Sequence, residues 1–152
     1  MCYIGYLNDD SSVAKMATED IKVWKVMNKV GDCFLAPHRH NYTYPDIRLQ
    51  VSNQLGVKIN YFLDAIFIEE GLHSYSSLYS YLNRIGNADE IVITECYIPK
   101  GSVYFTDGEE CVSQNLIFDK SYNSKEYLEY YSCNTFKKFF KRKPKPIYIW
   151  NT

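Results

Sequence analysis

Residues Glu90 to Phe118 constrain the fold of this chain more than any other stretch. Ile91 to Ile98 is an almost unbroken apolar run with several β-branched residues, and a run of eight residues predicts a buried central strand rather than a helix. A shorter run, Ser102 to Phe105, leads to the turn dipeptide Asp107-Gly108, after which Cys111 to Phe118 returns as a third strand. Three strands joined by tight turns are therefore expected to form the core of a sheet.

The rest of the pattern predicts one domain of mixed class. With 152 residues the chain can bury about two thirds of its unfolded surface without a metal or a disulfide. Further strands are expected at Ile21 to Met27, Tyr61 to Ile68 and Ile147 to Trp150, and short helices from the capping residue Ser76 to Ile85 and at Ser124 to Tyr131. We therefore expect a single α+β domain over residues 1–152, with a strongly bent mixed or antiparallel sheet and about two to four short helices.

The five cysteines indicate a reducing compartment. They are odd in number and scattered, and none forms a CxxC or CxxH pair, so the cysteines do not predict a zinc site. No cofactor is expected. The first residues lack the pattern of a signal peptide, and no apolar run approaches the roughly 18 residues of a membrane span. A soluble, cytoplasmic protein of unknown oligomeric state is therefore expected.

A basic segment near residue 140 interrupts an otherwise acidic chain. Six of the 17 lysines and arginines lie between Phe136 and Pro146, so the remaining eleven face 18 acids and leave a net charge of about −7 elsewhere. Basic residues interleaved with phenylalanines are typical of a nucleic-acid binder, whereas at helical spacing they form an ordinary amphipathic helix with a solvated charged face. The patch that would bind nucleic acid or an acidic partner comprises Lys137, Lys138, Lys141, Arg142, Lys143 and Lys145.

Two short stretches are candidates for a ligand site. His38-Arg39-His40 lies in a polar, Pro-interrupted segment expected to be a loop, which can bind an anion, hold a metal if His73 comes near, or be solvated. His73, Ser74 and Tyr75 precede the helix expected after Ser76, where free backbone N–H groups favour an anion, although a plain helix cap has the same pattern. We expect both stretches to converge beside the middle of the sheet, and the fifteen tyrosines either to add binding surface or to cover half-exposed strands.

The stretches GLHSYSS and TECYIPKGSVYF resemble a family of small proteins of phages and gut bacteria that carry a "G-[FL]-H-S" stretch followed by "IPKGxxY". The pattern spans about Ile21 to Phe118. The resemblance implies a phage-encoded protein that acts in the host cytoplasm, and it does not supply the family's function.

The order of elements also resembles, more remotely, ADP-ribosyltransferase-like folds. Glu95, just before Pro99-Lys100-Gly101, is placed like the catalytic glutamate of those enzymes, and Ser74 or Ser76 like their serine. Lys25 stands where they have Arg or His, and Ile93 where they have a second acid. A fold that keeps the nucleotide-sized cleft without these groups would act as a binder.

The sequence therefore ranks three functions. The first is a non-enzymatic binding protein that acts against host defence by capturing an anionic, nucleotide-like ligand or a host protein. The ligand would contact His38, Arg39, His40, His73, Ser74, Tyr75 and Lys25. The second is an ADP-ribosyltransferase-like enzyme that uses Glu95 and Ser74, and the third is a nucleic-acid binder that works through Lys137 to Lys145.

Overall fold

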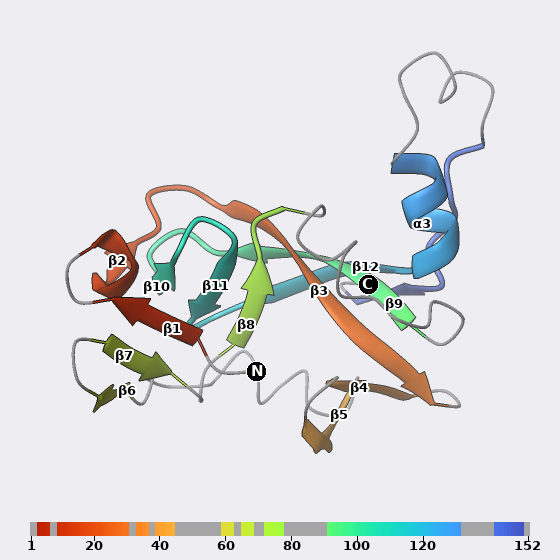
Figure 1. The fold of residues 1–152 in the computed structure, drawn as a ribbon. Coiled ribbons are helices and arrows are strands. Elements are labelled where there is room, and N and C mark those ends of the chain that lie inside the picture. The colour runs from red at the N-terminus through yellow and green to blue at the C-terminus, as the bar shows by residue number, and fades with distance from the viewer. Residues whose placement is uncertain are drawn as a thin grey trace.

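A computed structural model describes residues 3–6, 9–30, 33–36, 39–44, 59–62, 65–68, 72–77, 91–131 and 142–150; for residue 30 and the ranges from 33 to 68 it describes the backbone alone. Figure 1 shows a long, twisted sheet with a helix over one end and a smaller sheet against the other. Every pairing between described strands is antiparallel. The described chain is mostly β with a little α, which confirms the antiparallel alternative and the coarser part of the expected class.

The main sheet is open and follows one path through eight strands, in the order β13-β12-β9-β3-β8-β11-β10-β2. The hairpin of β4 and β5 branches from this order of strands, because β4 pairs with the last residues of β3. The strands of the main sheet are β2 (Lys15–Met16), β3 (Ile21–Val30), β4 (Cys33–Ala36), β5 (Arg39–Tyr44), β8 (Leu72–Tyr75), β9 (Ile91–Ile98), β10 (Val103–Thr106), β11 (Glu110–Ser113), β12 (Ile117–Asn123) and β13 (Tyr148–Ile149).

A second sheet of three strands lies beside β10 and β11 (Figure 1). Its order is β1-β7-β6, where β1 is Tyr3–Tyr6, β7 is Ala65–Ile68 and β6 is Ile59–Phe62. Tyr3 joins it to the main sheet: its ring lies 6.5 Å from the ring of Phe105, and its hydroxyl donates to the carbonyl of Ser11 at 2.7 Å. Ser11 belongs to η1 (Asp10–Ser12), a 3₁₀ turn that Asp9 caps.

The prediction of a central strand at residues 91–98 is confirmed, since β9 lies between β12 and β3. The prediction that Cys111 to Phe118 is one strand is wrong. The chain ends β11 at Ser113, crosses the sheet through Gln114 and Asn115, and enters β12 beside β9, so the two halves of that stretch have different neighbours. Gly108 has a φ of 99°, which confirms the turn that joins β10 to β11.

Other expected elements change in length or kind. β3 continues to Val30, beyond its expected end at Met27. The segment near Arg39 was expected to be a loop, but it contains β4 and β5. The single strand expected at Tyr61 to Ile68 is the hairpin of β6 and β7. The helix expected from Ser76 to Ile85 lies outside the described residues after 77.

The expected helix at Ser124–Tyr131 is confirmed as α3. The side chain of Asn123 accepts the backbone N–H of Glu126 at 3.2 Å, so Asn123, rather than the expected Ser124, caps it. Tyr127 points from α3 onto the sheet and is almost fully buried.

Side chains of β3 alternate between two hydrophobic cores, because neighbouring residues of a strand point to opposite faces. Val23 and Met27 enter one core, which we call the Cys96 core; Trp24 and Val26 enter the other, under α3, which we call the Tyr127 core. The buried members of the Cys96 core are Ala17, Val23, Met27, Leu72, Val92, Cys96, Ile98, Cys111, Leu116, Phe118 and Trp150; those of the Tyr127 core are Val26, Tyr75, Ile93, Tyr122 and Tyr127.

The main sheet is weakest where β3 meets β8. A single residue pair, Trp24 with Tyr75, joins these two strands in the described chain, whereas β3 and β9 pair over eight residues from Ile21 to Asn28. In Figure 1, β8 meets β3 at its Tyr75 end and the two strands diverge from there. The main sheet is therefore two well-paired halves that share one described strand pair and the Cys96 core.

Candidate functional site

A row of polar side chains crosses the main sheet on the face of the Cys96 core. Thr94 of β9 pairs with Lys25 of β3 on one side and with Ser121 of β12 on the other. Ser74 of β8 lies on the same face as Lys25, because the paired residues Trp24 and Tyr75 that adjoin them point to the opposite face. We call Ser74, Lys25, Thr94 and Ser121 the polar row. All four residues are buried.

At the β12 end the polar row is fully hydrogen-bonded. The hydroxyls of Thr94 and Ser121 lie 2.7 Å apart, and the indole Nε1–H of Trp150 donates to the Ser121 hydroxyl at 2.8 Å. Buried polar groups cost little when they pair in this way. This end of the row therefore has a structural role and fixes Trp150 beside β12.

At the β8 end the polar row lacks acceptors. Lys25 is 9% exposed, and its Nζ donates to the backbone carbonyl of His73 at 2.9 Å. An ammonium has three N–H donors, and no carboxylate of the described residues forms an ion pair with this one. Burial lowers the pKa of Lys25, and the nearby Cys96 thiol acts in the opposite direction. The positive charge of Lys25 is therefore uncompensated within the described chain.

Ser74 completes this end of the row. It is 0% exposed, and among the described buried side chains its hydroxyl is the one polar group without a hydrogen-bond partner. An unsatisfied buried hydroxyl costs about 1–3 kcal/mol. Lys25 and Ser74 thus supply N–H and O–H donors on the same face of β3 and β8, and both donor types are suited to anionic oxygens.

Of the residues predicted to line an anion site, Lys25 and Ser74 are buried on the same face of the sheet, and Lys25 reaches β8 through its bond to the backbone carbonyl of His73. The Nδ1 atom of His73 lies 3.4 Å from Oε1 of Glu110, so this ring faces a carboxylate. Tyr75 points into the Tyr127 core. His73 and Tyr75 share one face of β8, and Ser74 lies on the other.

The histidine-rich stretch is only partly described. His38 lies outside the described residues, and Arg39 and His40 belong to β5, whose side chains are not described. β4 links this hairpin to β3 at residues 28–30, about 13 Å along the strand from the junction with β8. The expected convergence with Ser74 thus stays a prediction.

The basic patch is also partly described. Lys137, Lys138 and Lys141 lie outside the described residues, while Arg142, Lys143 and Lys145 are exposed and belong to no helix or strand. The cations nearest β13 therefore point into solvent, consistent with either interpretation of the segment.

Glu95 lies on the opposite face from Ser74. It is 8% exposed and points from β9 toward α3, where its Oε1 accepts the hydroxyl of Tyr127 at 3.1 Å. That hydroxyl in turn accepts the indole Nε1–H of Trp24 at 3.0 Å. Because the sheet separates Glu95 from Ser74, the two groups of the expected transferase site do not meet.

Three observations bear on chemistry within the described chain. No three of its His, Cys, Asp or Glu side chains group closely enough to hold a metal ion. Cys96 and Cys111 are free and buried, and burial raises the pKa of both thiols. None of its helices has the length and apolar character needed to cross a bilayer.

Comparison with known proteins finds no matching family model, no matching curated protein and no matching solved structure. The resemblances drawn from sequence motifs therefore stay predictions, and functional inference depends on the geometry described above.

Sequence reasoning missed the hydrogen-bonded chain from Trp24 to Tyr127 and from Tyr127 to Glu95. Contacts between β3, β9 and α3 depend on the tertiary fold. The sequence did contain a signal for the buried lysine. In the strand expected from Ile21 to Met27, Lys25 lies on the same face as Val23 and Met27. A lysine on this apolar face is expected to be buried.

Proposed function

We propose that this chain is a non-enzymatic binding protein that captures a small, nucleotide-like ligand by its anionic group, held between β3 and β8. Lys25 supplies the positive charge and Ser74 a hydroxyl donor. The observation that carries the proposal is that the amino group of Lys25 and the hydroxyl of Ser74 are both buried on one face of β3 and β8, the hydroxyl without a hydrogen-bond partner and the amino group without an acidic partner in the described chain.

The energetics favour an anion at this position. A buried charge is costly unless it is paired, and a protein that keeps one without a carboxylate gains when a ligand supplies the opposite charge. A phosphate or carboxylate oxygen would accept the spare N–H groups of Lys25 and the hydroxyl proton of Ser74. The ligand's net contribution is then large, because it relieves two unsatisfied groups at once.

Beyond Trp24 and Tyr75, strands β3 and β8 share no described backbone pairing, and the bond from Lys25 Nζ to the carbonyl of His73 links them there. The proposal places the anionic group at this point, where it would replace the His73 carbonyl. The side chain of Lys25 can exchange this carbonyl for a ligand oxygen without breaking any described strand pairing.

The sequence resemblance extends the proposal to a biological setting. A phage-encoded binder of nucleotide-like anions, active in the cytoplasm of the host cell, would act against host defence by removing a nucleotide from solution. Sequestration needs binding alone, for which hydrogen-bond donors are sufficient.

Isothermal titration calorimetry against a panel of phosphate, ADP-ribose, mononucleotides and cyclic nucleotides tests the proposal. We expect at least one of them to bind, and Lys25→Met and Ser74→Ala each to weaken that binding at least about tenfold, the loss expected for one charged or buried hydrogen bond. Matched controls are Lys29→Met, at the exposed end of β3, and Ser113→Ala, whose buried hydroxyl bonds the carbonyl of Leu72. No binding across the panel, or equal losses in the controls, would contradict the proposal.

A further inference from the structure

We infer that the opposite face of β3 and β9 carries a second site, for an organic ammonium group, formed by the carboxylate of Glu95 and the indole ring of Trp24. In the present structure the ammonium of Lys22 lies there and acts as an internal substitute for the ligand. This site is independent of the proposed anion site, which lies across the sheet in the polar row.

Glu95 has capacity to accept further hydrogen bonds. A carboxylate has about four acceptor positions, and the described chain fills one of them closely, with the hydroxyl of Tyr127 at 3.1 Å. The ammonium of Lys22 is 3.9 Å from Oε2, beyond hydrogen-bonding distance. A carboxylate whose side chain is only 11% exposed therefore lies near its cation without a hydrogen bond to it.

Trp24 supplies the second half of the site. The Nζ atom of Lys22 lies 5.6 Å from the centre of the Trp24 ring, within the range of a cation–π contact. Trp24 and Glu95 are direct partners in the pairing of β3 with β9, and the bonds from Trp24 to Tyr127 and from Tyr127 to Glu95 hold the ring and the carboxylate in fixed positions. One cation thus contacts both a π face and a negative charge, as in aromatic sites for ammonium ligands.

Tyrosines pack around Tyr127, the partner of Glu95, and the charge of Glu95 makes the potential there negative. The rings of Tyr122 and Tyr131 lie 5.0 Å and 4.3 Å from that of Tyr127. Burial, followed by the charge of Glu95, raises the pKa of Tyr122 to about 12 and also raises the pKa of Tyr131. Such a setting favours an alkylated ammonium over a small hydrated ion, because the alkyl groups pack on rings and lose little water.

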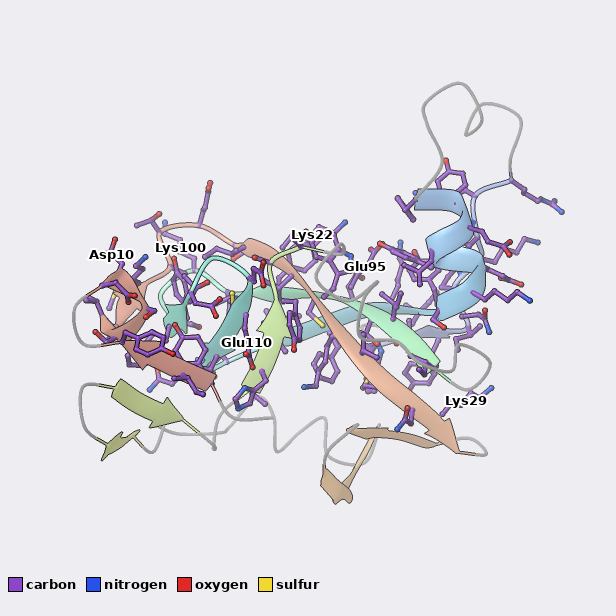
Figure 2. The ribbon with its side chains drawn as sticks, in the orientation of Figure 1. Asp10, Lys22, Lys29, Glu95, Lys100 and Glu110 are labelled. Atoms are coloured by element: carbon purple, nitrogen blue, oxygen red, sulfur yellow. The ribbon has the colours of Figure 1, made fainter. Side chains whose placement is uncertain are left out.

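Lys22 can leave the site at little cost. Its side chain is 45% exposed, and Figure 2 shows it beside Glu95, whereas Lys29 lies at the far end of the same strand. Exposed ion pairs contribute little to stability, so a ligand that makes closer contact with Glu95 and Trp24 can displace this ammonium. Lys22 would then act as a competitor that sets the affinity of the site.

Nuclear magnetic resonance titration of the full chain with choline, and separately with a peptide that contains trimethyl-lysine, tests the inference. The probe is the indole N–H signal of Trp24, assigned through Trp24→Phe, with that of Trp150 as internal control. We expect Lys22→Met to tighten binding roughly fivefold, Lys29→Met to leave it unchanged, and Glu95→Gln to abolish it. If the peptide binds more tightly than choline, the source is a protein; equal affinities indicate a free ammonium ligand.

The inference fails if neither probe shifts the Trp24 signal in Lys22→Met, or if Glu95→Gln binds as tightly as the parent. Should Glu95→Gln fail to fold, Trp24→Phe followed by calorimetry serves instead, with a loss of affinity of about fivefold expected and no loss contradicting the inference. Lys25→Met separates the two proposals, because it removes the anion site and leaves ammonium binding intact.

Discussion

Lys25 is the residue at which the stability and the proposed function of this chain oppose each other. It lies between Val23 and Met27 on the apolar side of β3, where a methionine would pack without desolvating a charge. Binding sites commonly keep such destabilising groups, and removing them stabilises the fold at the expense of function. The protein with Lys25 is therefore expected to be less stable than the variant with an apolar residue at this position. Lys25 is nevertheless expected to be necessary for ligand binding.

We predict that Lys25→Met raises the free energy of unfolding by roughly 1–2 kcal/mol at about pH 7. Burial lowers the pKa of Lys25 in the fold, so the unfolded chain binds the extra proton and the parent gains stability as pH rises toward 10.5. The advantage of the variant should thus shrink at about pH 9.5, as measured by urea denaturation without added phosphate. Lys29→Met is the control. A stability difference between Lys25→Met and the parent that stays the same as pH rises would contradict the lowered pKa of Lys25.

Among the elements, β13 depends on one side chain. It pairs with β12 through only two residues, and Trp150 beyond it is 1% exposed, packs edge-on against Phe118 at 5.0 Å and donates to Ser121. Short edge strands gain little from their own hydrogen bonds, so the buried indole is expected to hold the strand in place.

We predict that Trp150→Ala lowers the free energy of unfolding by about 3–5 kcal/mol, the usual cost of deleting a large buried aromatic side chain. Ile149→Ala should change it by less than about 0.5 kcal/mol, because Ile149 is exposed on the same strand. Chemical denaturation measures both. Similar effects of the two substitutions would show that Trp150 does not anchor β13.

Elements with strong local patterns could be predicted from the sequence. β9 and α3 were found because an eight-residue apolar run and a capped amphipathic segment depend on neighbouring residues alone. The division of residues 111–118 into β11 and β12 was missed, since Ser113 to Asn115 carries no Gly or Pro to mark a break. Lys25 and Ser74 were named as candidates, but their meeting depends on the pairing of β3 with β8, which joins residues far apart in the chain.

At the scale of the whole molecule, two cores on opposite faces of one sheet bury groups that titrate in alkali. Burial raises the pKa of Tyr122 to about 12, and it also raises the pKa values of Tyr3, Tyr127 and the two buried thiols, Cys96 and Cys111. Each of these groups stays protonated in the fold at a pH where the unfolded chain has lost the proton. Their contribution to stability is present below the ordinary pKa values of 9.0 and 10.0 and is lost above them.

We predict that the free energy of unfolding falls steadily from pH 10.5, the ordinary pKa of lysine above which Lys25 adds no further stability, to about pH 12. Urea denaturation in reducing buffer across this range measures the fall. Tyr122→Phe should make it less steep, whereas Tyr6→Phe, at an exposed position, should not. A flat profile would show that the buried tyrosines ionise as easily in the fold as in the unfolded chain.

The proposed anion site requires that the buried amino group of Lys25 and the hydroxyl of Ser74 share an anion between β3 and β8. Anomalous diffraction from crystals equilibrated with bromide tests this requirement, because bromide is a small anion whose anomalous scattering identifies its position. We expect a bromide peak within hydrogen-bonding distance of Lys25 Nζ and Ser74 Oγ, absent from crystals of Lys25→Met. A well-ordered Lys25 bonded only to protein atoms, with no bromide beside it, would contradict the proposal.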